Sequence, residues 1–223
     1  MMPASTTATR ERTTMSTSDT SMQPRDEATA PRMVRARGFG LLLVLTGAVA
    51  WIASGILVLE RIALYKNPDY VTSCDFNPWV SCGTVMKSTQ AALLGFPNPF
   101  LGVVGFGIVI TIGMALLAGA RFARWYWIGV QIGVSLAMVF IIWLWSQALY
   151  EINALCLYCM IVWAMMIPMF LYTTARNIAH GVIPASAAVR RAVAEWTWVA
   201  TTVLLVLTAA SIVLRFPGAF FGA

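Results

Sequence analysis

Charged side chains are scarce in this chain, at 11% of its 223 residues, whereas a soluble domain carries about 25%. Histidine occurs once, as His180, and cysteine only four times. The shortage of charge excludes an ordinary soluble domain. Hydrophobic residues make up 59% of the chain and gather in long uncharged stretches. The sequence therefore predicts a protein that crosses a lipid bilayer several times.

Five stretches are long enough to cross a hydrocarbon core of about 30 Å: 39–59, 100–118, 125–148, 155–172 and 196–214. Each is expected to be a helix, because lipid offers the backbone no hydrogen-bond partner. The first four are expected to form a four-helix transmembrane bundle. The fifth, set apart by the segment 181–194, is expected to pack on its outside. The predicted fold class is an all-α membrane protein.

The chain divides into three predicted parts. Residues 1–36, rich in Ser, Thr, Ala and charge, are expected to be a disordered cytoplasmic tail. Residues 37–175 would form the four-helix catalytic bundle with an outer loop at 60–99. Residues 176–223 would form a cytoplasmic loop and the fifth transmembrane helix.

The basic residues predict the orientation in the membrane. They gather before the first stretch, between the second and third, and between the fourth and fifth: Arg32, Arg35, Arg37, Arg121, Arg124, Arg176, Arg190 and Arg191. These regions are expected on the cytoplasmic side of a bacterial inner or plasma membrane, with the N-terminus inside and the C-terminus outside. The net charge of +6 follows from this topology, and nucleic acid is not expected as a partner.

The loop 60–99 falls on the outer side and is long enough to suggest a function. A short helix lying along the membrane surface is expected from Ser81 to Leu94. Ser81 would cap its start and Gly95 would end it.

All four cysteines form two pairs on this outer side: Cys74 with Cys82 in the loop, and Cys156 with Cys159 at the start of the fourth stretch. If that helix begins near Asn153, the i, i+3 spacing places both sulfurs of the second pair on one face. Two pairs in an oxidising compartment favour thiol–disulfide exchange between an outside protein and a carrier in the membrane.

Two other interpretations of the cysteines stay open. The membrane pair fits buried, unreactive core residues, and the loop pair fits a static bridge that holds the loop. A metal site is not expected, because His180 lies on the cytoplasmic side and exposed outer thiols would oxidise.

These motifs resemble those of the vitamin K epoxide reductase family, in particular its bacterial disulfide-forming branch, over roughly residues 37–175. The likeness consists of a Cys-Asp step, a Cys-x7-Cys loop, a serine six residues later, a Pro-Asn-Pro-Phe-Leu-Gly helix start and a Cys-x-x-Cys helix start. In this chain the Cys-Asp step is Cys74-Asp75, the Cys-x7-Cys loop runs from Cys74 to Cys82, and the serine is Ser88. The proline-rich helix start is 97–102, and the second pair is Cys156 and Cys159. Family members often have tyrosine one turn beyond the second membrane cysteine. This chain has Trp163 there, which leaves a hydrogen bond to the carrier at that point open.

The resemblance implies a quinone-dependent thiol oxidoreductase. A separate thioredoxin-like protein outside the membrane would deliver two electrons to the loop pair through Cys74. Cys82 would then attack Cys156 and pass the electrons to the membrane pair. Cys159 would reduce a quinone of the menaquinone, ubiquinone or vitamin K type. The oxidised partner would then insert disulfides into secreted proteins.

The resemblance also implies a quinone pocket lined by Asn98, Ser88 and Trp163, with Asn98 as donor to a quinone oxygen. Each residue has a second interpretation: Asn98 as a helix cap, Ser88 as a partner of its own helix backbone, and Trp163 as core packing. Two alternative functions stay open. One is reduction of vitamin K epoxide or quinone as the main activity, and the other is a non-enzymatic membrane protein with static disulfides.

Overall fold

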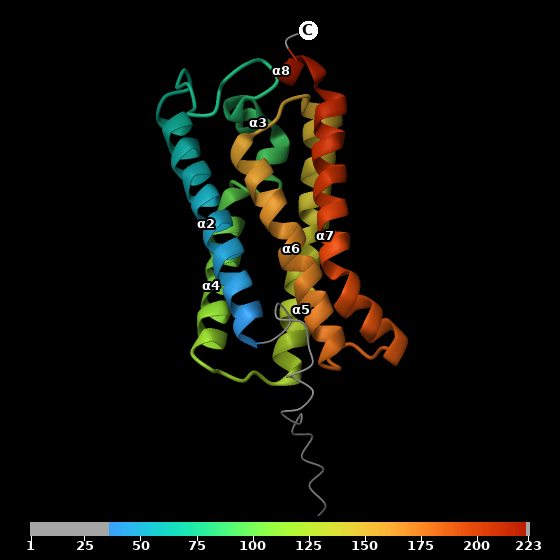
Figure 1. Cartoon of the computed structure of the whole chain (residues 1–223). Coiled ribbons are helices and arrows are strands. Elements are labelled where there is room, and N and C mark those ends of the chain that lie inside the picture. Colours follow the sequence, from blue (N-terminus) through green and yellow to red (C-terminus); the bar gives the residue numbers. More distant parts are fainter. Residues whose placement is uncertain (1–35, 222–223) are drawn as a thin grey trace, which may run out of the picture.

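The structure is a computed structural model that describes residues 36–221 (Figure 1). The tail predicted for 1–36 lies outside the described residues, apart from Ala36, which begins a helix. The described part of the chain is built from helices and their connections, with two isolated β-bridges and no strands. The chain is an all-α membrane protein, as the sequence predicts.

Five helices are long and apolar enough to cross a membrane, which confirms the five predicted spans. They are α2 (Ala36–Lys66), α4 (Pro99–Leu117), α5 (Arg124–Ser146), α6 (Leu157–Ala179) and α7 (Ala187–Arg215). Both α2 and α7 run well past the predicted uncharged stretches. A helix propagates through its backbone hydrogen bonds, so each of these two helices continues through polar residues, such as Glu60 in α2 and Arg191 in α7, that lie outside the predicted stretches.

The bundle is assembled around α2 and α6. Helix α2 packs against α4 and α6, α5 packs against α6, and α7 lies alongside α6 at the edge of the bundle (Figure 1). Glycines let α2 and α4 approach closely: a Cβ atom on Gly113 would lie 2.9 Å from the carbonyl oxygen of Gly40. Small residues commonly allow such contacts between membrane helices.

The loop between α2 and α4, residues 67–98, is called here the cysteine loop. Its helix differs from the continuous one predicted from Ser81 to Leu94. Helix α3 covers only Cys82–Lys87, and a separate 3-10 turn covers Thr89–Ala92. The break lies at Ser88, whose backbone is extended and whose side-chain hydroxyl donates to the carbonyl of Val85 at 2.7 Å. A side chain that bonds the preceding turn competes with helix continuation.

The predicted start of that segment is correct, whereas its predicted end at Leu94 is not, because the last helical residue is Ala92. The Ser81 hydroxyl accepts a hydrogen bond from the Thr84 N–H at 3.1 Å and so caps α3. Gly95 has a φ of +83°, a backbone region that favours glycine, and it follows the 3-10 turn. The segment before α6 shows another irregularity, because α5 continues into a π-helical turn at Gln147–Ile152.

Candidate redox site

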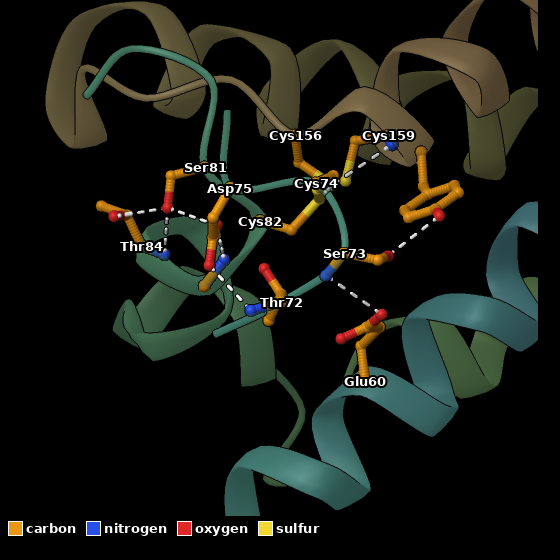
Figure 2. Close-up of a disulfide and its surroundings, with 12 residues drawn as sticks. Glu60, Thr72, Ser73, Cys74, Asp75, Ser81, Cys82, Thr84, Cys156 and Cys159 are labelled. Atoms are coloured by element: carbon orange, nitrogen blue, oxygen red, sulfur yellow. Dashed lines mark hydrogen bonds between the residues drawn. A yellow bond between two sulfur atoms is a disulfide. The ribbon is translucent and has the colours of Figure 1, made fainter. Parts of the chain in front are cut away.

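The two cysteine pairs meet at one end of the bundle (Figure 2). Cys74 and Cys82 form a disulfide, while Cys156 and Cys159 are free thiols. The Cys82 and Cys156 sulfur atoms lie 3.1 Å apart. The sulfurs of Cys74, Cys82 and Cys156 all lie within 4.8 Å of one another. The arrangement therefore allows a sulfur of one pair to attack a sulfur of the other with little movement.

A short backbone pairing sets the position of Cys82 relative to Cys156. The N–H of Ser81 donates to the carbonyl of Leu155 at 2.9 Å, and the N–H of Leu155 donates to the carbonyl of Trp79 at 2.7 Å. Ser81 and Leu155 immediately precede the two cysteines, so the pairing brings the next residue of each segment together. No local sequence signal indicates a contact between segments so far apart in the chain.

Cys156 occupies the N-cap of α6, one position before the helix in which it was predicted. The predicted start near Asn153 is wrong, because Asn153 has a left-handed backbone, with a φ of 52°, and closes the π-helical turn. Leu155 must stay extended to pair with the cysteine loop, so α6 begins only at Leu157. As N-cap, the Cys156 sulfur accepts a hydrogen bond from the Cys159 N–H at 3.4 Å.

Asp75 joins the two segments that carry the loop cysteines. One carboxylate oxygen accepts from the Ser81 hydroxyl at 2.7 Å and the Gly83 N–H at 3.0 Å, and the other accepts from the Thr72 N–H at 2.9 Å. Burial opposes ionisation of this carboxyl. The hydrogen bonds outweigh burial and hold the pKa of Asp75 below its ordinary value of 3.8. Asp75 therefore acts on the shape of the loop.

A cavity of about 940 Å³ lies next to the membrane pair, between α4 and α5. Cys156 and Cys159 are in its wall, and so are all three predicted pocket residues: Ser88, Asn98 and Trp163. Most of the lining is apolar, from residues such as Phe106 and Val134. The structure thus brings the predicted pocket residues and the membrane thiols to one space.

The polar side chains of this wall also bind the loop itself. The Asn98 amide donates to the carbonyl of Gln90 at 2.7 Å, and its oxygen accepts from the Leu93 N–H at 3.2 Å. Trp163 is buried and packs on Leu149 and Leu155. Asn98 and Trp163 therefore stabilise the surrounding structure as well as lining the cavity. Gln90 also lines the cavity, but it belongs to no motif, so the sequence does not predict it there.

The model of the vitamin K epoxide reductase family matches residues 41–174. The chain belongs to this family. Its matched region contains both cysteine pairs and the wall of the cavity, whereas α7 lies beyond it. Family membership makes this protein a membrane thiol oxidoreductase in general terms. No curated protein matches the chain.

The cavity fits the kind of acceptor that enzymes of the vitamin K epoxide reductase family generally use, a quinone. Its volume of about 940 Å³ falls within the range of small-molecule sites, roughly 300–1,000 Å³. An apolar wall with a few polar groups suits a lipid-soluble ring with carbonyl oxygens. Both thiols of the membrane pair lie in that wall.

Proposed function

We propose that this protein is a quinone-dependent thiol oxidase, which oxidises a separate thioredoxin-like protein and so supports disulfide formation in secreted proteins. The observation that carries the proposal is the 3.1 Å contact between the sulfurs of Cys82 and Cys156. A static bridge in the loop would have no need of a free thiol against its disulfide. Here that thiol belongs to a second pair, which reaches a cavity in the membrane bundle.

The exchange steps balance in electrons and protons. A partner dithiol reduces the Cys74–Cys82 disulfide through Cys74, giving two loop thiols and an oxidised partner. When the membrane pair is a disulfide, the Cys82 thiolate attacks Cys156 and releases Cys159 as a thiolate. Cys74 then attacks Cys82, which restores the loop disulfide and releases Cys156. The two electrons end on the membrane pair, which is the state that the structure describes.

The membrane pair must then lose its electrons into the cavity. A bound quinone would supply a two-electron, two-proton acceptor there. Cys159 lies in the cavity wall and would return to a disulfide with Cys156. Asn98 donates one amide hydrogen to Gln90 and has a second that suits a carbonyl oxygen. The apolar walls formed by α4 and α5 exclude water and suit an isoprenoid tail.

The proposed orientation places the cysteine end outside the cytoplasm, as the arginine distribution indicates. Apolar side chains beside Cys74 support contact with a partner protein on that side. Val71 and Phe76 are 71% and 67% exposed, and they lie three residues before and two residues after Cys74. Large exposed apolar side chains of this kind mark interaction sites.

The proposal is tested with purified protein, reduced thioredoxin as the stand-in partner and a short-chain ubiquinone or menadione as acceptor. We expect thioredoxin thiols to disappear as quinone is consumed, one dithiol for each quinone. Cys82→Ser and Cys156→Ser should each reduce this rate to background. Faster turnover with vitamin K epoxide than with either quinone would favour the alternative reductase. No acceptor-dependent thiol loss would contradict the proposal.

A further inference from the structure

Three of the four cysteines, Cys74, Cys82 and Cys156, are buried away from solution. Cys74 and Cys156 are each 1% exposed and Cys82 is 0% exposed. A partner thiol must approach a disulfide sulfur directly in order to attack it. The segment around Cys74 must therefore move before a partner can react. The contacts that hold this segment in place therefore determine how often the Cys74–Cys82 disulfide is accessible from solution.

Ser73, the residue before Cys74, is held by two different membrane helices (Figure 2). Its backbone N–H donates to the carboxylate of Glu60 in α2 at 3.3 Å. Its hydroxyl lies 3.1 Å from the hydroxyl of Tyr158 in α6, with either oxygen able to donate. The first contact joins residues 13 apart in the sequence, and the second joins residues 85 apart. They fasten the cysteine loop to the bundle directly beside the reactive disulfide.

Tyr158 stands between Cys156 and Cys159 in the sequence. The first turn of α6 therefore carries the membrane pair and also the hydroxyl that contacts Ser73. Any movement of the Cys74 segment away from this turn breaks the Ser73–Tyr158 contact. The Ser73–Tyr158 contact is thus present only when the loop pair lies against the membrane pair.

Glu60 lies on the side of α2 that faces the cysteines. Leu57 and Leu64, about one turn on either side of it, pack in the same cluster as Cys74, Cys82 and Cys156. The Glu60 side chain is only 8% exposed. Its negative charge raises the pKa of Tyr70, at the start of the same loop segment. A buried carboxylate is costly unless it is bonded. One Glu60 oxygen accepts from Ser73, whereas the other is buried without a hydrogen-bond partner among the described residues. The Ser73 N–H therefore supplies the hydrogen bond that links Glu60 to the cysteine loop.

We propose that Tyr158 and Glu60 are positioning residues that hold Ser73, and with it Cys74, in the closed position. Closure favours exchange between Cys82 and Cys156 over exchange with thiols from solution. The consequence for turnover rests on the proposed function, whereas the effect on access to the disulfide does not. Losing one anchor should open the loop more often, so solution thiols react faster while internal transfer slows. A single hydrogen bond of this kind corresponds to roughly a twofold to tenfold change.

Access is measured without quinone or partner, by the rate at which dithiothreitol reduces the Cys74–Cys82 disulfide in the full-length protein. The new thiols are trapped with a polyethylene-glycol maleimide and counted on gels. Tyr158→Phe and Ser73→Ala each remove one side of the same contact, and each should raise the rate roughly twofold to tenfold. The double variant should match either single variant, because both delete one interaction. Tyr150→Phe, at a tyrosine that is 61% exposed, is the matched control and should leave the rate unchanged.

The anchor on α2 is tested in the same assay. Glu60→Ala should raise the rate of disulfide reduction, whereas Glu60→Gln keeps an oxygen acceptor for Ser73 and should lie closer to the unmodified protein. An unchanged rate in Tyr158→Phe, or effects of Tyr158→Phe and Ser73→Ala that multiply in the double variant, would overturn the proposal.

Turnover with reduced thioredoxin and quinone gives the second readout. Tyr158→Phe should lower kcat while kcat/KM for thioredoxin stays level or rises, since access improves as internal transfer weakens. A fall in both constants, together with a lower melting temperature, would indicate a merely structural residue and overturn the proposal. If the unmodified protein shows no quinone-dependent turnover, the proposed function fails, and the dithiothreitol assay alone still decides whether these residues hold the loop closed.

Discussion

Asp75 shows how much of the redox geometry depends on a single side chain. It is the residue after Cys74, yet it bonds both residues that flank Cys82. Gly83 makes this possible, because a Cβ atom there would lie 3.0 Å from an Asp75 oxygen. A nearby carboxylate would by charge disfavour a thiolate. Asp75 therefore contributes by joining the two halves of the cysteine loop, and not by activating a thiol.

Asp75→Asn should loosen the loop at neutral pH, because an amide lacks the acceptors for all three donors. We expect about 1–2 kcal/mol less protection of the Thr72 and Gly83 amides, measured by hydrogen exchange in detergent. Asp75 has a lower pKa folded than unfolded. Its contribution is therefore fully present above about pH 3.8 and is lost as the pH falls through the folded pKa.

The difference between the unmodified protein and Asp75→Asn should accordingly shrink in strongly acidic solution. Asp69→Asn, at an exposed residue of the same loop, is the control and should leave both amides protected. Equal protection in Asp75→Asn and the unmodified protein at pH 7 would show that the carboxylate does not hold the loop.

At the scale of elements, the turn before Cys156 is stabilised by the far end of α7. Arg215 donates to the carbonyl of Leu149 at 3.1 Å and to the side-chain oxygen of Asn153 at 2.6 Å. Phe216 packs in the same cluster as Leu149 and Leu155. π-helical turns often occur at functional sites. Helix α7, which lies beyond the family match, therefore supports the segment that leads into the membrane pair.

Arg215→Ala should destabilise the protein by about 1–2 kcal/mol and slow quinone-dependent thiol oxidation. Arg215→Lys should recover less than half of the loss, because an ammonium group cannot reproduce the fixed fork of a guanidinium. The measurement is unfolding in detergent, alongside turnover with reduced thioredoxin. Arg191→Ala, at the opposite end of α7, is the control. Equal effects of the two alanine variants would show that the hydrogen bonds of Arg215 do not stabilise the turn before Cys156.

The elements differ in how far the sequence could predict them. Hydropathy predicted the five long helices, because burial in lipid acts on every residue of a span. It could not predict the break at Ser88 or the late start of α6. Those follow from a serine that bonds its own helix and from the pairing of Leu155 with Ser81. Both depend on contacts that hydropathy does not contain.

At the scale of the whole molecule, the fold brings a soluble-type loop against the end of a membrane helix. The four cysteine positions were clear from the sequence, since no other residues offered redox chemistry. The contact between Cys82 and Cys156 came only from the family resemblance, because the two residues belong to different parts of the chain and no local pattern links them. The pocket residues Asn98 and Ser88 came from family resemblance, and the structure adds that both also bond the cysteine loop.

The central claim is that Cys82 and Cys156 form the bridge between the loop pair and the membrane pair. The most direct measurement is mass mapping of disulfides after mild oxidation in two double variants. Cys74→Ser with Cys159→Ser leaves Cys82 and Cys156, which lie 3.1 Å apart at sulfur, and should form a nearly complete bridge. Cys82→Ser with Cys156→Ser leaves the other two cysteines and should form little. Equal bridging in both variants, or none in the first, would contradict electron transfer through a Cys82–Cys156 bridge.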